Sequence, residues 1–99
     1  MKSPISLAVV GCGYWGPNLI RNFRSLPNCQ LKAMCDLRDE RLKHLCSLYS
    51  DVAALTEFHK VLEIAGLHAV AIATPVRHHF ALAKASLLAG KHTLIEKPM

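Results

Sequence analysis

The sequence has no long hydrophobic run. Its apolar stretches are the length of strands, well short of the about 20 consecutive apolar residues that a membrane helix needs. The stretch from residue 5 to 10, ahead of Cys12, is also shorter than the roughly 7 to 15 apolar residues of a signal peptide. We therefore expect no membrane association and no secretion, and a cytoplasmic protein.

Cysteine pairs of the kind that hold metals or form disulfide frameworks are also missing. The cysteines stand at positions 12, 29, 35 and 46, without a Cys-x-x-Cys spacing, which is typical of buried free thiols in a reducing compartment. The neighbouring His78 and His79 would point in different directions on a helix, so they cannot present one tetrahedral face. No metal site is expected.

Basic runs are absent as well. The 12 Lys and Arg residues give a net charge of +5 but are scattered along the chain. A protein that tracks a nucleic-acid backbone needs a basic stripe, so we expect no nucleic-acid partner. A composition of 52% hydrophobic and 19% charged residues over 99 positions indicates one globular domain.

Short apolar runs alternate with segments of helical period. Strands are predicted at 5–10, 30–35, 52–55, 68–73 and 92–95, with helices at 15–25, 42–49, 56–66 and 76–90. This alternation predicts a doubly wound parallel α/β sheet with helices on both faces, in the strand order 3-2-1-4-5. We expect Thr56 to cap the third helix, and the fourth helix to turn inward the side chains of Val76, Phe80, Ala83 and Leu87.

A glycine-rich turn follows the first predicted strand. Gly11, Gly13 and Gly16 have the spacing G-x-G-x-x-G at the start of a helix, which indicates a Rossmann-type turn for a dinucleotide pyrophosphate. The first allows the tight turn, the second admits the phosphates and the third lets helix and strand pack closely. Free N–H groups of the first helical turn would then face the anion. Tyr14 and Trp15 would shield the pyrophosphate, although packing against the sheet fits Trp15 equally well.

Asp36 ends the second predicted strand, twenty positions after Gly16. A carboxylate at this place can accept both ribose hydroxyls of the adenosine half and repels a 2′-phosphate, which favours NAD over NADP. The alternative is that Asp36 is the N-cap of the second helix. Arg38 keeps NADP open, because its guanidinium would pair with a 2′-phosphate or stack on adenine.

Five motifs then occur in one order, "GCGYWG", "CDLRDER", "ATPVRHH", "AGKH" and "EKPM". Together they resemble the N-terminal domain of the glucose-fructose oxidoreductase, inositol dehydrogenase and rhizopine-catabolism (Gfo/Idh/MocA) family, over essentially the whole chain. The form "GCGYWGPN" with "TPV" also resembles the subgroup that oxidises nucleotide-linked sugars at the 3-hydroxyl. The resemblance implies an NAD-dependent oxidoreductase that acts on a CH–OH group of a sugar or polyol.

The resemblance also implies roles for residues near the nicotinamide. Thr74 and Pro75 would line the nicotinamide-side ribose, and His79 would shape the same region unless it is an ordinary polar helix residue. Glu96 would lie close to the nicotinamide. Lys97 would reach both the cofactor and the substrate hydroxyl, where an ammonium group can stabilise the oxygen that loses its proton or relay that proton. The alternative for this last segment is a charged strand end with a proline terminator.

Members of the family continue with a second α/β domain, which binds the sugar and often forms the oligomer interface; this sequence does not contain it. Residues 1–99 are therefore expected to be a fragment of a Rossmann domain, truncated after the fifth strand, that binds NAD without turnover of its own. The resemblance implies a homo-oligomer for the full-length protein. The alternative is a free-standing, non-catalytic module that binds or senses dinucleotides.

Overall fold

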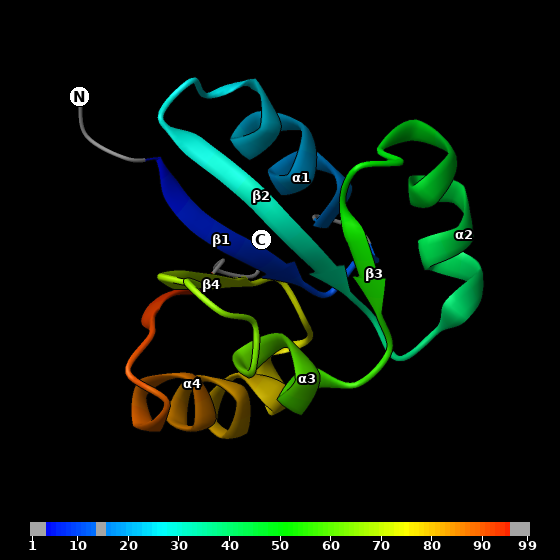
Figure 1. Cartoon of the computed structure of the whole chain (residues 1–99). Coiled ribbons are helices and arrows are strands. Elements are labelled where there is room, and N and C mark those ends of the chain that lie inside the picture. Colours follow the sequence, from blue (N-terminus) through cyan, green and yellow to red (C-terminus); the bar gives the residue numbers. More distant parts are fainter. Residues whose placement is uncertain (1–3, 14–15, 96–99) are drawn as a thin grey trace.

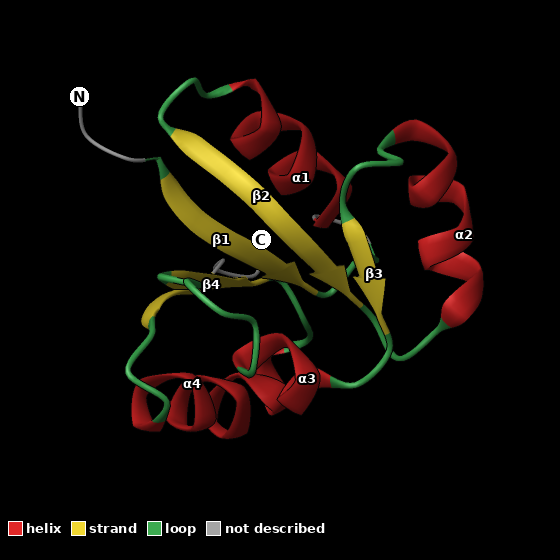
Figure 2. Cartoon of the chain, in the orientation of Figure 1, coloured by secondary structure: helices red, strands yellow, loops and turns green. Residues whose placement is uncertain are grey.

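The structure, a computed structural model, describes residues 4–13 and 16–95 (Figure 2). Its strands are β1 (Ile5–Val10), β2 (Cys29–Cys35), β3 (Ala53–Leu55), β4 (Ala69–Ile72) and β5 (His92–Ile95). Its helices are α1 (Gly16–Ser25), α2 (Asp39–Leu48), α3 (Phe58–Leu62) and α4 (His79–Leu88), and a 3₁₀ turn, η1 (Val76–His78), leads into α4. None of the helices within these residues is long and apolar enough to cross a membrane.

The strands form one parallel sheet in the order β3-β2-β1-β4-β5, which confirms the predicted topology. Helices α1 and α2 cover one face of the sheet, whereas α3 and α4 cover the other (Figure 1). The connections that leave β1 and β4 therefore go to opposite faces. A sheet of this kind leaves a crevice at the carboxyl ends of the strands where this reversal occurs.

Each face of the sheet buries its own hydrophobic cluster. Val9 of β1 belongs to the first cluster, together with Ile20 of α1 and Leu42 of α2. The next residue, Val10, belongs to the second cluster with Val61 of α3. Successive side chains of a strand point to opposite faces, so a strand that is covered on both sides is apolar at most positions, and in β1 the buried exception is Ser6. This explains why the predicted bounds of β1 agree with the structure.

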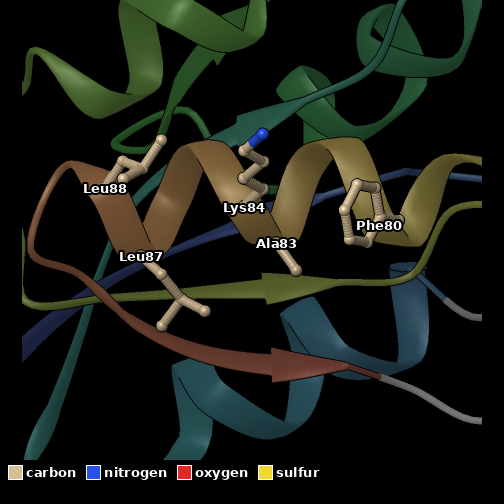
Figure 3. A pocket seen from close by; sticks show the side chains of 5 residues that line it. All are labelled: Phe80, Ala83, Lys84, Leu87 and Leu88. Carbon is tan, nitrogen blue, oxygen red and sulfur yellow. The ribbon is translucent and has the colours of Figure 1, made fainter.

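The inward face predicted for the fourth helix is wrong in part. Ala83 does pack against the second cluster, but Phe80 and Leu87 are 77% and 63% exposed. These two residues line an open apolar recess along the outer side of α4, with Lys84 and Leu88 beside them (Figure 3). The side chain of Val76 lies outside what the structure describes.

The 3₁₀ turn before α4 explains this error. A 3₁₀ turn has 3.0 residues per turn instead of the 3.6 of an α-helix, so a helical period counted from Val76 places the inward face one position off. The side chains that turn toward the sheet are Leu82, Ala83 and Ser86, and the Ser86 hydroxyl donates to the Leu82 carbonyl at 2.8 Å. Because α4 is apolar almost all round, its sequence pattern could not reveal the shift.

The predicted cap of the third helix is also wrong. Glu57 is the N-cap residue of α3, and no side chain caps that end. The helix stops at Leu62, because the following amides bond three residues back, as Ile64 does to Val61 at 3.2 Å. Gly66, with a φ of 78°, therefore lies beyond the helix and turns the chain toward β4.

Truncating one leucine on each side of α4 tests the corrected phase. Leu82→Ala should lower the free energy of unfolding by about 1–3 kcal/mol, because Leu82 packs against the second cluster. Leu87→Ala should change it by less than about 0.5 kcal/mol, because that side chain is exposed. Urea unfolding followed by circular dichroism measures both values. The reverse order would show that the period counted from Val76 was correct.

Candidate functional site

The glycine turn leaves β1 at the centre of the sheet. Gly11 has a φ of 98°, and a Cβ on it would lie 2.8 Å from the carbonyl carbon of Ala73 and 2.9 Å from Cγ2 of Thr74. A Cβ on Gly16 would overlap the carbonyl oxygen of Gly11. Backbone packing therefore requires glycine at both positions, as the motif predicted.

Gly13 is different, because its free side faces a side chain instead of backbone. A Cβ there would meet Nη1 of Arg41 at 2.8 Å, and no backbone atom within 4 Å is among its three nearest contacts. An arginine side chain is flexible and can move away, so it does not permanently block the space above Gly13. Tyr14 and Trp15, which complete the predicted turn, lie outside the described residues.

The carboxylate of Asp36 joins the glycine turn to the loop after β2. The Cys12 backbone N–H donates to Oδ2 at 2.8 Å, and the Arg38 backbone N–H donates to Oδ1 at 2.8 Å. Nη1 of Arg41 lies 3.4 Å from Oδ2, as a long ion pair with a carboxylate that is itself buried. The N-cap residue of α2 is Arg38, so the alternative interpretation of Asp36 as that cap is wrong.

Two thiols are buried beside this carboxylate. Burial, reinforced by the charge of Asp36, raises the pKa of Cys12 from 9.0 to about 12 and that of Cys35 to about 11. The Cys12 Sγ lies 3.5 Å from the Cys35 carbonyl oxygen. Both groups therefore stay protonated near neutral pH, where a thiol is a poor nucleophile and metal ligand. All four cysteines are free, as predicted from their spacing.

The loop after β4 forms the other side of the site. The His79 ring places Nε2 2.7 Å from the Thr74 carbonyl oxygen, so the tautomer with a proton on Nε2 donates to it. This bond anchors the first turn of α4 to the loop, with Pro75 exposed between them. The Thr74 hydroxyl is buried and finds no hydrogen-bond partner among the residues described. Burying a hydroxyl without a hydrogen bond costs free energy, so this is a position where a hydrogen bond to a ligand would be favourable.

Strand register explains why these segments meet. Cys35, Val10, Ile72 and Ile95, from β2, β1, β4 and β5, pair in one row across the sheet. Asp36, Gly11 and Ala73 follow directly in sequence, at the same edge. Glu96 and Lys97, which follow β5 in sequence and were predicted to lie near the nicotinamide, lie outside the residues described.

Two residues at this edge escaped the sequence interpretation. Arg41 contacts Asp36 and covers Gly13. The sequence pattern pointed to Arg38 instead, whose side chain makes no hydrogen bond or ion pair to any other described residue. Leu37 is 83% exposed directly after the carboxylate. A large apolar residue directly after an acidic strand end is visible in the sequence, and it could have marked Leu37 as a candidate site residue. Arg41 gave no comparable signal, because the contact depends on how α2 begins.

A family model described as an oxidoreductase family with an NAD-binding Rossmann fold, GFO_IDH_MocA, matches residues 5–99. The chain is similar to a D-apiose dehydrogenase of Paraburkholderia graminis, with 30% identity over 97 residues that cover 92% of this chain and 24% of that protein. It is also similar to a glycosyl hydrolase family 109 protein of Streptomyces coelicolor, with 26% identity over 104 residues, covering 96% of this chain and 22% of that protein.

Among solved structures, the chain is similar to GenD2 from gentamicin A biosynthesis, which was crystallised in complex with NAD. The TM-score is 0.91 at 26% identity, over 99% of this chain and 28% of that one. The chain thus spans only 22% to 24% of the length of the two curated relatives named above.

The buried thiols should make the protein less stable at alkaline pH. The folded state keeps protons on Cys12 and Cys35 that the unfolded state loses above pH 9.0. Their contribution to stability is therefore complete below pH 9.0 and is lost as the pH rises toward about 11 to 12. Each group should contribute a slope of about 1.4 kcal/mol per pH unit in that range.

Urea unfolding between pH 8 and 10.5 checks this. Cys12→Ala should flatten the alkaline fall in stability, whereas Cys29→Ala, at a partly exposed position, should leave it as in the unmodified chain. Equal slopes for all three proteins would contradict the assignment.

Proposed function

The chain belongs to the Gfo/Idh/MocA oxidoreductase family as its NAD-binding Rossmann domain, and from this we propose that it is the cofactor half of a dehydrogenase acting on the CH–OH group of a sugar or polyol. The observation that carries the proposal is the buried carboxylate of Asp36. The Cys12 N–H holds it against the glycine turn at 2.8 Å, at the carboxyl edge where the connections that leave β1 and β4 go to opposite faces of the sheet. Parallel sheets of this kind bind dinucleotides at that edge.

The adenosine half of NAD would lie at the part of this edge formed by the ends of β1 and β2. Asp36 would accept the ribose hydroxyls, and the exposed Leu37 beside it would lie against the adenine. The turn from Gly11 to Gly16 would hold the pyrophosphate, since Gly13 has no Cβ and only a movable side chain above it. Tyr14 and Trp15 would shield the phosphates from solvent.

The nicotinamide half fits the loop after β4. We assign to the Thr74 hydroxyl, which has no hydrogen-bond partner among the described residues, a hydrogen bond with the nicotinamide-side ribose, next to Pro75. His79 would act indirectly, because its hydrogen bond to the Thr74 carbonyl oxygen holds this loop in place. Glu96, directly after β5, would lie close to the nicotinamide.

When NAD is bound, it supplies the acceptor for a hydride. Lys97 would bind the substrate hydroxyl and would stabilise the oxygen that loses its proton, or relay that proton, as the carbinol carbon is oxidised. The assignment of this role to Lys97 rests on the resemblance of the motif "EKPM" to the family. The thiols beside Asp36 stay protonated near neutral pH and would be poor bases. Lys97 is thus the catalytic residue of the proposal.

The carbohydrate class of the substrate rests on the relatives, which include a D-apiose dehydrogenase and a glycosyl hydrolase family 109 protein. Since the chain covers about a quarter of those proteins, we propose that residues 1–99 form the cofactor domain alone, and that a second domain holds the sugar and the contacts of a homo-oligomer. The four free cysteines favour a reducing, cytoplasmic location.

Fluorescence titration of the chain with NADH tests the cofactor assignment. Asp36→Asn should weaken NADH binding about tenfold or more, because an amide offers one acceptor oxygen where the carboxylate offers two for the ribose hydroxyls. Asp39→Asn is the matched control, since Asp39 is an exposed acid three residues away and should leave the affinity unchanged. Absence of NADH binding by the unmodified chain would refute the proposed function.

Lys97→Ala tests the catalytic assignment in a chain that also contains the proposed second domain. The turnover number should fall by about 100-fold or more, as expected for loss of a positioned proton-transfer group. Lys84→Ala, at an exposed position on α4, is the control and should keep full activity. The 99-residue chain alone should bind NADH without oxidising sugars. Efficient oxidation by that chain would disprove the need for a second domain.

A further inference from the structure

Exposed apolar side chains gather at one edge of the sheet. Nine large hydrophobic residues are exposed in the described part of the chain, and five of them belong to α4 and β5. These five are Phe80, Leu87, Leu88, Leu94 and Ile95. Helix α4 contacts β5, so the five residues lie in one region, which we call the α4–β5 edge. Apolar patches that are contiguous in this way mark contact surfaces, whereas single exposed side chains do not.

The backbone of β5 also has a free side. β5 is the last strand of the sheet, next to β4. The His92 N–H donates to the His68 carbonyl, just before β4, at 2.9 Å. Alternate residues of a strand direct their backbone groups to opposite sides, so the N–H and C=O of Thr93 point outward, where no other strand of the described chain lies. An open strand edge is a template for pairing with another strand.

The opposite edge of the sheet is protected against such pairing. Strand β3 has only three residues, and the acidic residues Asp51 and Glu57 lie close to its two ends. Short strands and charged side chains are common protections of a sheet edge. β5 has no Asp, Glu, Lys, Arg or Pro, and its pairing with β4 shows no bulge. Lys91, just before β5, is bound to its own chain, because Nζ donates to the Leu67 carbonyl at 2.9 Å.

A twofold axis can join two copies of β5. An axis at Thr93, perpendicular to the sheet, makes the two strands antiparallel and lets each Thr93 N–H donate to the Thr93 carbonyl of the other copy. It also keeps both copies of α4 on the same face of the joined sheet. Since α4 contacts both β4 and β5, the two helices would be about two strand spacings, or roughly 10 Å, apart. Packed helices have axes about 8–10 Å apart, so this pairing of the strands also brings the helices into contact.

We propose that two copies of this chain form a dimer through the α4–β5 edge, with β5 paired antiparallel about Thr93. Leu87 points from α4 toward the strands, whereas Lys84 points away from them (Figure 3). Leu87 of each copy therefore packs against α4 of the other, and the Lys84 ammonium stays in solvent. Because β3 is protected, association stops at two copies. This contact belongs to residues 1–99 and is separate from the oligomer contacts that we assign to a second domain.

Light scattering after size exclusion, over a range of protein concentrations, tests the strand pairing. The unmodified chain should have twice the 10.9 kDa mass of one chain and should dissociate on dilution. Thr93→Pro should be a monomer, because proline has no N–H to donate and is tolerated in an edge strand where that N–H points outward. Thr93→Ala, which keeps the N–H, is the matched control and should remain a dimer.

Leu87→Glu tests the helix contact without touching the strand. A glutamate there should weaken the self-association about tenfold or more, because the dimer would bury its charge without a partner. Leu48→Glu, at a position on α2 that is also exposed, is the matched control and should leave the dimer unchanged. Both leucines are exposed, so neither change should unfold the chain, and circular dichroism checks this for all four variants.

Three results would overturn the proposal. The first is a monomer at every concentration, which would indicate that a different partner or a further part of a longer protein covers this edge. The second is a series of particles of no fixed size, because pairing at one edge closes after two copies. The third is a dimer that persists in both Thr93→Pro and Leu87→Glu, since the contact would then lie elsewhere.

Discussion

The close contact of Gly11 with the loop after β4 is the constraint on which the rest of this site depends. Its amide donates to the Cys35 carbonyl at 2.7 Å, while the preceding Val10 carbonyl accepts from the Ala73 amide at 2.8 Å. The chain then turns away with a φ of 98°, against Ala73 and Thr74. Because no Cβ fits there, the glycine turn and the β4 loop lie together, and the two halves of the proposed dinucleotide site lie at one edge of the sheet.

Charge at this edge is arranged around one carboxylate. Asp36 is buried and satisfied by two backbone amides, with a single guanidinium as its ionic partner in the described chain. The same burial and the same negative charge keep the neighbouring thiols protonated. Among the residues described, the edge therefore offers a carboxylate that can accept from hydroxyl groups, and its buried thiols are poor nucleophiles near neutral pH. This is chemistry suited to holding a cofactor, and it leaves bond-making to a group from elsewhere, which we propose to be Lys97.

Features that depend on local pattern could be predicted from the sequence. β1 needs apolar residues on both faces, so its bounds were readable, and the alternation of strands and helices led to the sheet order. The α4 face and the Thr56 cap could not be read in this way. Which side of a helix faces the sheet depends on whether its first turn is 3₁₀ or α-helical. Which residue is the N-cap depends on where the helix begins after the preceding strand. Both are decided by small differences in backbone geometry.

The sequence by itself determined the fold class, the position of the glycine turn and the acidic end of β2, because residue type and spacing carry that information. Only the tertiary structure decided which side chains meet at this edge of the sheet. It placed Arg41 beside Asp36 and above Gly13, left the Thr74 hydroxyl without a partner in the described residues, and connected His79 to the Thr74 carbonyl. These relations join residues on separate elements, and their distances follow from how the strands align and the helices begin.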